Sequence, residues 1–172
     1  MTTTLTEQAI PTGTWTLDKI HSQVGYAIRH AGVSLFKGEI GGFEASLADG
    51  ALSGSAPVTG ITVSDENLAG HLLSPDFFDA ERFPQVSFTS TEIRRDGDEL
   101  VVEGELEIRG TRRPVSLRGT ISGPVNDRIG ISLETQIDRT DFGINWQMEL
   151  PGGGAALEND VRLTADLELV KA

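Results

Sequence analysis

The chain has 172 residues, with 14 lysines and arginines against 26 aspartates and glutamates, so its formal charge is −12. This length is typical of one domain. The negative charge repels phosphate backbones and anionic lipid headgroups, so we expect no nucleic-acid partner. No apolar run approaches the roughly 20 residues of a membrane-spanning helix, so the composition predicts a soluble domain. The sequence contains no cysteine, which excludes disulfides, thiolate nucleophiles and cysteine-ligated metals.

The N-terminal residues predict a short tail before the domain. We expect residues 1–12 to be a flexible segment and residues 13–172 to form a single domain. Residues 1–18 contain no basic segment followed by an apolar stretch, so we expect neither a secretory signal nor a lipid anchor. The expected location is therefore the cytoplasm.

Apolar and polar residues alternate along the first third of the domain, which is the period of a strand with one dry face. The pattern covers residues 24–30 and returns over residues 36–47, where Gly41-Gly42 is interpreted as a bulge. Asp49-Gly50 is a hairpin dipeptide and predicts a tight turn between two strands.

Residues 64–78 do not alternate and predict the helical segment of the protein, near residues 65–79. Ser64 or Asp65 can cap a short helix whose leucines recur at helical spacing, and Ser74-Pro75 ends it. Four phenylalanines lie close to this segment: Phe77, Phe78, Phe83 and Phe88. They are interpreted first as core packing, with a plug on the barrel or the lining of an apolar mouth as alternatives.

The second half of the chain alternates most regularly. Four segments carry the pattern: residues 100–108, 115–122, 129–137 and 161–169. Asp96-Gly97 predicts another hairpin, and Gly110 to Pro114 and Gly123-Pro124 are predicted to separate strands.

Eight or nine long antiparallel strands, each with one apolar face, must close into a barrel or stack as two sheets. We predict the barrel, because long strands make a tall wall and four glycines fall on inward faces: Gly38, Gly42, Gly104 and Gly119. These glycines either leave room in the lumen or only relieve the coiling of the sheet, and both interpretations stay open.

The candidate catalytic residues do not form a known constellation. The three histidines, His21, His30 and His71, show no ligand spacing, so no metal site is expected. His30 closes an apolar face and is interpreted as an interior histidine in preference to a polar group in a pocket. No nucleophile elbow is present, so we expect no enzyme.

Charged residues cluster just after the alternating segment of residues 129–137. Asp138, Arg139 and Asp141 are expected to place an ion pair beside Trp146. We interpret this group as a structural pin at a barrel corner in preference to a ligand contact.

Five motifs follow one another along the chain: Trp15 to Tyr26, Arg29 to Ser34 with Phe36 to Gly38, Gly70 to Thr91, Gly104 to Val115, and Asp138 to Trp146. In these motifs the chain resembles the YceI-like, or polyisoprenoid-binding, proteins of bacteria, from Gly13 to about Lys171. The resemblance implies a lipocalin-like extended antiparallel β-barrel of about eight strands in an all-β fold. It also implies a polyisoprenoid ligand in the lumen and a homodimer. It implies no reaction and no cofactor.

The resemblance and the inward faces together nominate twelve residues to line or close the lumen. They are Tyr26, Ile28, His30, Phe36, Phe43, His71, Phe77, Phe78, Phe88, Leu106, Phe142 and Trp146. The chain departs from the family pattern at Leu68, Ala69 and Leu73, which stand at usually charged positions. If those charges contact a headgroup, this member has lost that contact, and its headgroup stays open.

The expected function is noncatalytic binding, storage or transport of a polyisoprenoid or a similar long-chain apolar lipid. Two alternatives stay open. One is an enzyme that acts on a lipid in the same cavity through His30 or His71 with a carboxylate. The other is a filled barrel that binds a protein on its outer surface.

Overall fold

The computed structural model describes residues 9–172, so the first eight residues of the expected flexible segment lie outside the described part of the chain. Within the described part of that segment, Ile10 packs against the core. The strands are β1 (Thr14–Leu17), β2 (Gln23–His30), β3 (Ser34–Glu39), β4 (Glu44–Ala48), β5 (Ala51–Pro57), β6 (Gln85–Asp96), β7 (Glu99–Ile108), β8 (Thr111–Val125), β9 (Arg128–Asp138) and β10 (Leu157–Lys171). The helix α1 is Glu66–Leu73, and single 3-10 turns occur at Val58–Gly60 and Arg139–Phe142.

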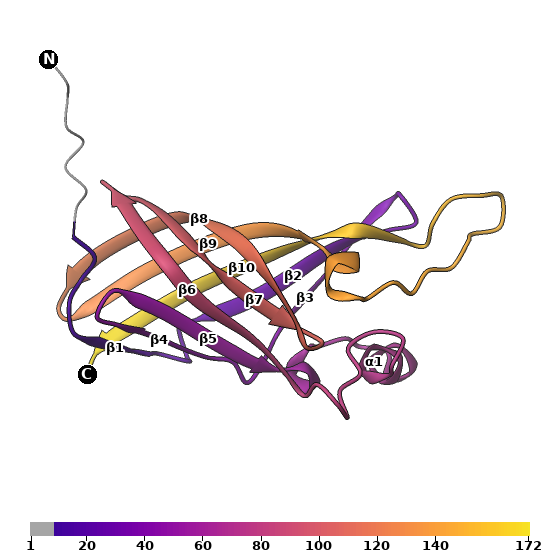
Figure 1. Ribbon diagram of the computed structural model, residues 1–172, viewed down its shortest axis with the longest axis horizontal. Coiled ribbons are helices and arrows are strands. Elements are labelled where there is room, and N and C mark those ends of the chain that lie inside the picture. The colour runs from indigo at the N-terminus through magenta and orange to yellow at the C-terminus, as the bar shows by residue number, and fades with distance from the viewer. Residues whose placement is uncertain (1–8) are drawn as a thin grey trace, which may run out of the picture.

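Eight of the strands close into an antiparallel barrel in the order β1-β4-β5-β6-β7-β8-β9-β10 (Figure 1). The ring closes because β1 pairs with β4 on one side and with the C-terminal end of β10 on the other. The N-terminal part of β10 pairs instead with β2, and β3 pairs with β2. This arrangement confirms the predicted all-β barrel of about eight strands, with β2 and β3 extending its wall at one end.

The turns at Asp49-Gly50 and Asp96-Gly97 are where the sequence predicts them, between β4 and β5 and between β6 and β7. The break predicted at Gly110 to Pro114 is confirmed at Gly110, where a turn separates β7 from β8, but β8 already begins at Thr111 and runs through Pro114. The break predicted at Gly123-Pro124 is wrong, because β8 continues through Pro124 to Val125. Pro114 is tolerated because it lies opposite Glu105 of β7, before the part of β8 that pairs with β9. Pro124 falls where the register between β8 and β9 shifts.

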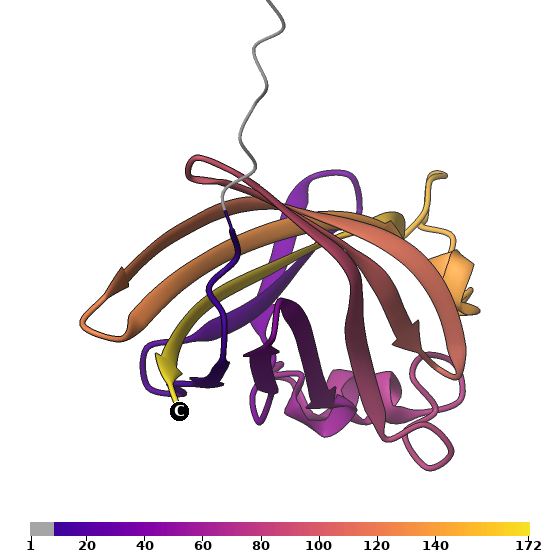
Figure 2. The same ribbon diagram turned by 60° about the vertical axis from the view of Figure 1, so that its left-hand side comes forward.

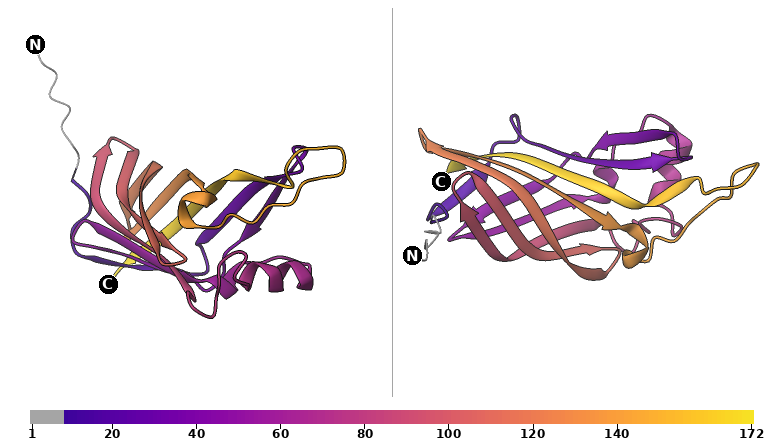
Figure 3. Two further views of the ribbon diagram at one scale, coloured as in Figure 1. Left: turned by 45° about the vertical axis from the view of Figure 1, so that its right-hand side comes forward. Right: turned by 90° about the horizontal axis from the view of Figure 1, so that it is seen from above.

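The predicted helix is confirmed. The side chain of Asp65 caps α1 by accepting a hydrogen bond from the backbone N–H of Leu68 at 2.8 Å, and Ser74 follows the last turn. With eight residues, α1 is short, and no helix within residues 9–172 is long and apolar enough to cross a membrane. It lies at the same end of the barrel as the β2–β3 hairpin (Figure 3).

The core is divided along the barrel axis. Figure 2 shows β4 and β5 (dark purple) facing the arch of β7, β8 and β9 across the barrel. A closed-end cluster fills the end where β1 completes the ring: Trp15, Leu47, Leu52, Leu100, Val102, Ile121, Ile129, Ile131, Leu133, Leu167 and Leu169. A mouth-end cluster of fewer buried residues lies at the other end: Phe77, Ile108, Ile137, Phe142 and Ile144.

The inward glycines relieve close approaches and do not leave room in the lumen. A Cβ on Gly104 would lie 2.5 Å from the Phe88 ring, and one on Gly119 would lie 1.7 Å from the carbonyl oxygen of Ser132. The space beside Gly38 is taken by the Tyr26 side chain, whose ring carbon Cζ would lie 2.6 Å from such a Cβ. Of the two interpretations left open by the sequence, the structure therefore favours relief of the sheet.

Candidate ligand-binding cavity

The end of the barrel beside α1 encloses a cavity of about 670 Å³, a volume within the usual range of small-molecule sites. Its floor includes Leu52, Leu133 and Leu167, which also belong to the closed-end cluster. The walls are the dry faces of the long strands, which point inward because alternate side chains of a strand lie on opposite faces. One barrel thus has a filled half and a hollow half.

The structure places all twelve nominated residues in the wall of this cavity: Tyr26, Ile28, His30, Phe36, Phe43, His71, Phe77, Phe78, Phe88, Leu106, Phe142 and Trp146. They come from β2, β3, β6, β7, α1 and the connections beside them. Their contact with a ligand stays a prediction. Of the four phenylalanines near the helix, only Phe83 does not line the cavity. The Arg82 guanidinium lies over its ring instead, with Arg82 Cζ 5.1 Å from the centroid of Phe83.

Three aromatic rings from separate segments form one side of the cavity. The ring of His71, on α1, makes edge-to-face contacts with Phe77 and with Trp146, each with centroids 4.9 Å apart. Phe77 and Trp146 are 5.3 Å apart. Such contacts join α1 to the loop of residues 143–156, and they bring together residues that the sequence separates by about half the chain.

The cavity opens to solvent beside the β2–β3 hairpin, where exposed residues line it: His30, Ser34, Phe36 and Met148. His30 pairs with Ser34 at the end of β2, beyond most of the barrel wall. The preferred interpretation of His30 as an interior histidine is therefore wrong, because the strand continues past the closed part of the barrel and carries this side chain into the mouth.

The sequence did not single out the aliphatic residues that make up most of the wall. Val86, Ile108, Val115, Leu117, Ile137, Leu157, Val161 and Leu163 line the cavity. Most belong to alternating faces that the sequence identifies as apolar, but alternation does not tell a packed position from one facing empty space. Leu68, one of the three departures from the family pattern, also lines the cavity.

Arg139 is buried, with 4% of its surface exposed, and pins the 143–156 loop. Its guanidinium donates hydrogen bonds to the backbone carbonyls of Ile144 at 2.9 Å, Trp146 at 2.7 Å and Glu158 at 3.0 Å. Burial lowers the pKa of Arg139. The structural role predicted for this residue therefore holds, but the predicted ion pair is wrong, because carbonyl oxygens and not carboxylates accept its hydrogen bonds.

The polar groups nearest the interior are already hydrogen-bonded. The Tyr26 hydroxyl donates to the carbonyl of Thr62 at 2.8 Å, and burial raises the pKa of Tyr26. Throughout residues 9–172, no buried side-chain nitrogen or oxygen lacks a partner. The interior can therefore hold an apolar molecule, and a polar group on that molecule would find its partners at the open mouth.

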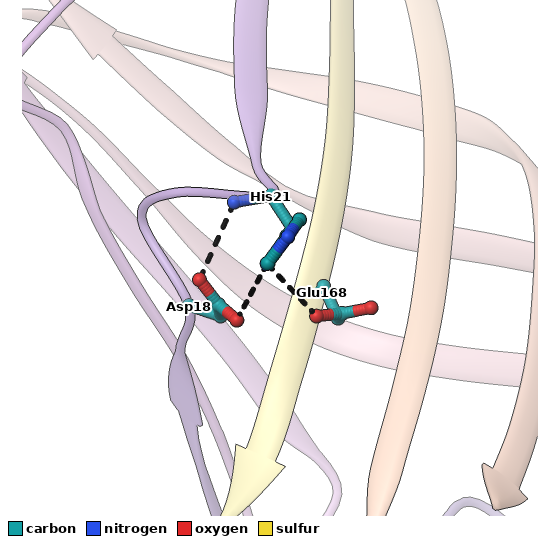
Figure 4. A group of neighbouring side chains, drawn as sticks. All are labelled: Asp18, His21 and Glu168. Carbon is teal, nitrogen blue, oxygen red and sulfur yellow. Dashed lines mark hydrogen bonds and ion pairs between the residues drawn. The ribbon is translucent and has the colours of Figure 1, made fainter.

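A cluster of charged side chains lies at the opposite, closed end of the barrel (Figure 4). His21 Nδ1 lies 2.9 Å from Asp18 Oδ2 and 3.5 Å from Glu168 Oε2. Hydrogen bonds from His21 and Arg128 hold the pKa of Asp18 well below its usual range, and the bond to Asp18 raises the pKa of His21. The Arg128 guanidinium donates hydrogen bonds to Asp18 at 3.0 Å and to Glu168 at 2.8 Å. Its positive charge therefore lies against the two carboxylates where a metal cation would bind.

The chain is similar to proteins of one family along most of its length. The model of the YceI-like domain matches residues 15–169. Protein YceI of Escherichia coli O157:H7 is 30% identical over 158 residues, covering 85% of this chain and 81% of that protein.

Two solved structures share the fold. Burkholderia cenocepacia BcnA superposes with a TM-score of 0.74 at 18% identity, covering 88% of this chain and 98% of that one. A polyisoprenoid binding domain from Saccharophagus degradans superposes with a TM-score of 0.71 at 11% identity, covering 92% of this chain and 98% of that one.

Proposed function

Because this chain belongs to the YceI-like domain family, we propose that it binds a polyisoprenoid or a similar long-chain apolar lipid in its cavity and stores or carries it without reaction. The observation that carries the proposal is the apolar cavity of about 670 Å³ above a filled floor. The Saccharophagus degradans domain of the same fold is a polyisoprenoid binding domain, which supports this choice of ligand.

The size of the cavity supports a chain of several isoprene units. A carbon group occupies about the 30 Å³ of a water molecule, so the volume of about 670 Å³ accommodates about twenty groups, or four isoprene units. Transfer from water at about 0.8 kcal/mol per group contributes about 16 kcal/mol in total. This exceeds the cost of association, which is about 4 to 15 kcal/mol, so net binding is favourable.

The distribution of polar groups sets the orientation of the proposed ligand. The apolar tail lies against the leucine floor, and the polar end lies at the mouth near His30 and His71, because the deeper polar groups are already paired. A longer chain extends through the mouth. This orientation requires no desolvated headgroup.

Native mass spectrometry and organic extraction of protein purified from its own host test the proposal. We expect a stoichiometric apolar molecule with a long unsaturated chain. Several preparations that contain only buffer components, together with no binding of a fluorescent prenyl probe to delipidated protein, would contradict it. We also propose a homodimer, which sedimentation equilibrium of the same preparations measures directly.

A second candidate, an enzyme that acts on a lipid in the cavity, rests on one contact. His71 Nε2 lies 2.9 Å from Asp76 Oδ2 at the edge of the cavity, the distance of a histidine oriented by a carboxylate. Mass spectrometry of the extracted lipid before and after incubation with fresh protein distinguishes the two functions, because a carrier returns the lipid unchanged.

A further inference from the structure

The mouth of the cavity carries apolar side chains that face solvent. Val33, at the tip of the β2–β3 hairpin, is 82% exposed, and Met148, in the 143–156 loop, is 52% exposed. Leu35 and Phe36 are also exposed on the hairpin. Both segments project from the same end of the barrel (Figures 1 and 3), and they are joined by the hydrogen bond from Ala31 N–H to the carbonyl of Ala156.

The same hairpin is a basic stretch of a strongly acidic chain. Residues 24–38 contain Arg29, His30 and Lys37 and no aspartate or glutamate, although the whole chain has a charge of −12. Arg29 pairs with Leu35, and Lys37 lies two residues further along the same face. Neither Arg29 nor Lys37 forms an ion pair with any residue in the described range. Residues 142–148 of the neighbouring loop carry no charge.

From this arrangement we propose that the mouth end docks on a lipid bilayer with anionic headgroups, with the tip of the β2–β3 hairpin in the interface and Arg29 and Lys37 on the headgroups. The inference rests on the proposed function, because it explains how an apolar cargo moves between cavity and membrane without crossing water. Exposed apolar tips next to cations are the pattern of interfacial membrane binding.

The rest of the surface fixes the orientation of docking. Across the mouth from the hairpin, α1 begins at the exposed acidic residues Asp65 and Glu66. An anionic surface repels these residues and attracts the hairpin. The barrel therefore approaches end-on, tilted toward the hairpin and away from the start of α1.

The geometry favours a bilayer over a second copy of the chain. The apolar residues lie on two projecting segments, whereas a stable protein interface needs a broad complementary surface. Two copies that met hairpin to hairpin would also bring Arg29 and Lys37 of each together, which is unfavourable.

Cosedimentation with vesicles tests the proposal, using phosphatidylcholine alone and phosphatidylcholine mixed equally with phosphatidylglycerol. We expect the wild type to bind the mixed vesicles and Val33→Ser/Leu35→Ser to bind them roughly tenfold or more weakly. The control is Ile20→Ser/Val125→Ser, which removes residues that are 88% and 66% exposed at the closed end. Arg29→Gln and Lys37→Gln should each weaken binding about fivefold on mixed vesicles and less on phosphatidylcholine alone.

Three results would overturn docking: no binding by the wild type, binding by Val33→Ser/Leu35→Ser equal to that of the wild type, or an equal loss in the closed-end control. If the wild type binds no vesicles and Val33→Ser/Leu35→Ser converts a dimer to a monomer, this surface contacts a second copy of the chain instead. Neither Val33 nor Leu35 lines the cavity, so binding of a prenyl probe in vesicle-free buffer should be unchanged. That measurement separates failure of docking from failure of the proposed function.

Discussion

Replacement of Leu106 by tryptophan tests the hollow half of the barrel against its filled half. Leu106 and Leu100 lie on the same face of β7, but Leu106 lines the cavity whereas Leu100 is 2% exposed within the closed-end cluster. Extra volume in a packed core costs about 1 to 3 kcal/mol. We therefore expect Leu100→Trp to lose that amount and Leu106→Trp to lose less than about 1 kcal/mol, because its indole has space to enter.

Thermal unfolding of delipidated protein measures this difference. For a domain of this size each kcal/mol corresponds to about 2–4 °C, so Leu100→Trp should lower the melting temperature by about 2–12 °C and Leu106→Trp by less than about 4 °C. The indole excludes about one isoprene unit, five carbons worth about 4 kcal/mol. A prenyl probe should then bind Leu106→Trp up to about a thousandfold more weakly.

Equal destabilisation by the two substitutions would contradict the hollow half of the barrel, because it would mean that the wall around Leu106 closes up in solution. Unchanged probe affinity in a stable Leu106→Trp protein would refute the placement of the ligand. Urea unfolding of the same three proteins provides a check on the thermal values, since the slope reports whether each variant exposes the same surface.

Arg139→Met should destabilise the protein by about 3 kcal/mol or more in urea unfolding, because it leaves buried carbonyls without a donor. It should also increase proteolysis in the 143–156 loop. An unchanged urea midpoint would contradict the role of Arg139 in holding this loop. His21→Asn should lower the melting temperature most below about pH 6.5. A histidine whose pKa is raised by folding stabilises the fold there, and this contribution disappears as the pH rises through the raised pKa. A melting-temperature difference between variant and wild type that grows with pH would contradict this sign. His71→Ala should lose two edge-to-face contacts, about 0.5 to 1.5 kcal/mol each. It should keep prenyl binding in a fluorescence titration. Stoichiometric metal in the wild type that is lost in this variant would favour the enzyme.

The strand faces, the hairpin turns and the helix follow from the local pattern of residues. Alternation assigns an inward face because it depends only on the two-residue period of a strand. The turn at Asp49-Gly50 and the cap at Asp65 are local, since each is made by the residue and its immediate neighbours. Alternation accounts for six of the twelve nominated residues in the cavity wall, Tyr26, Ile28, His30, Phe36, Phe43 and Leu106, whereas the family resemblance nominated the other six.

Contacts between distant strands determine which parts of those faces are packed and which face the cavity. Leu100 and Leu106 have the same side chain, strand and face, and only the residues that other strands bring opposite them differ. At the closed end, the four-residue β1 joins β4 to β10 and adds Trp15 to the filled core. At the other end β10 pairs with the projecting hairpin instead, so the ring is not filled there. Burial is a property of contacts between distant segments, and for this reason the cavity, the exposed position of His30 and the carbonyl partners of Arg139 were set by the closed barrel.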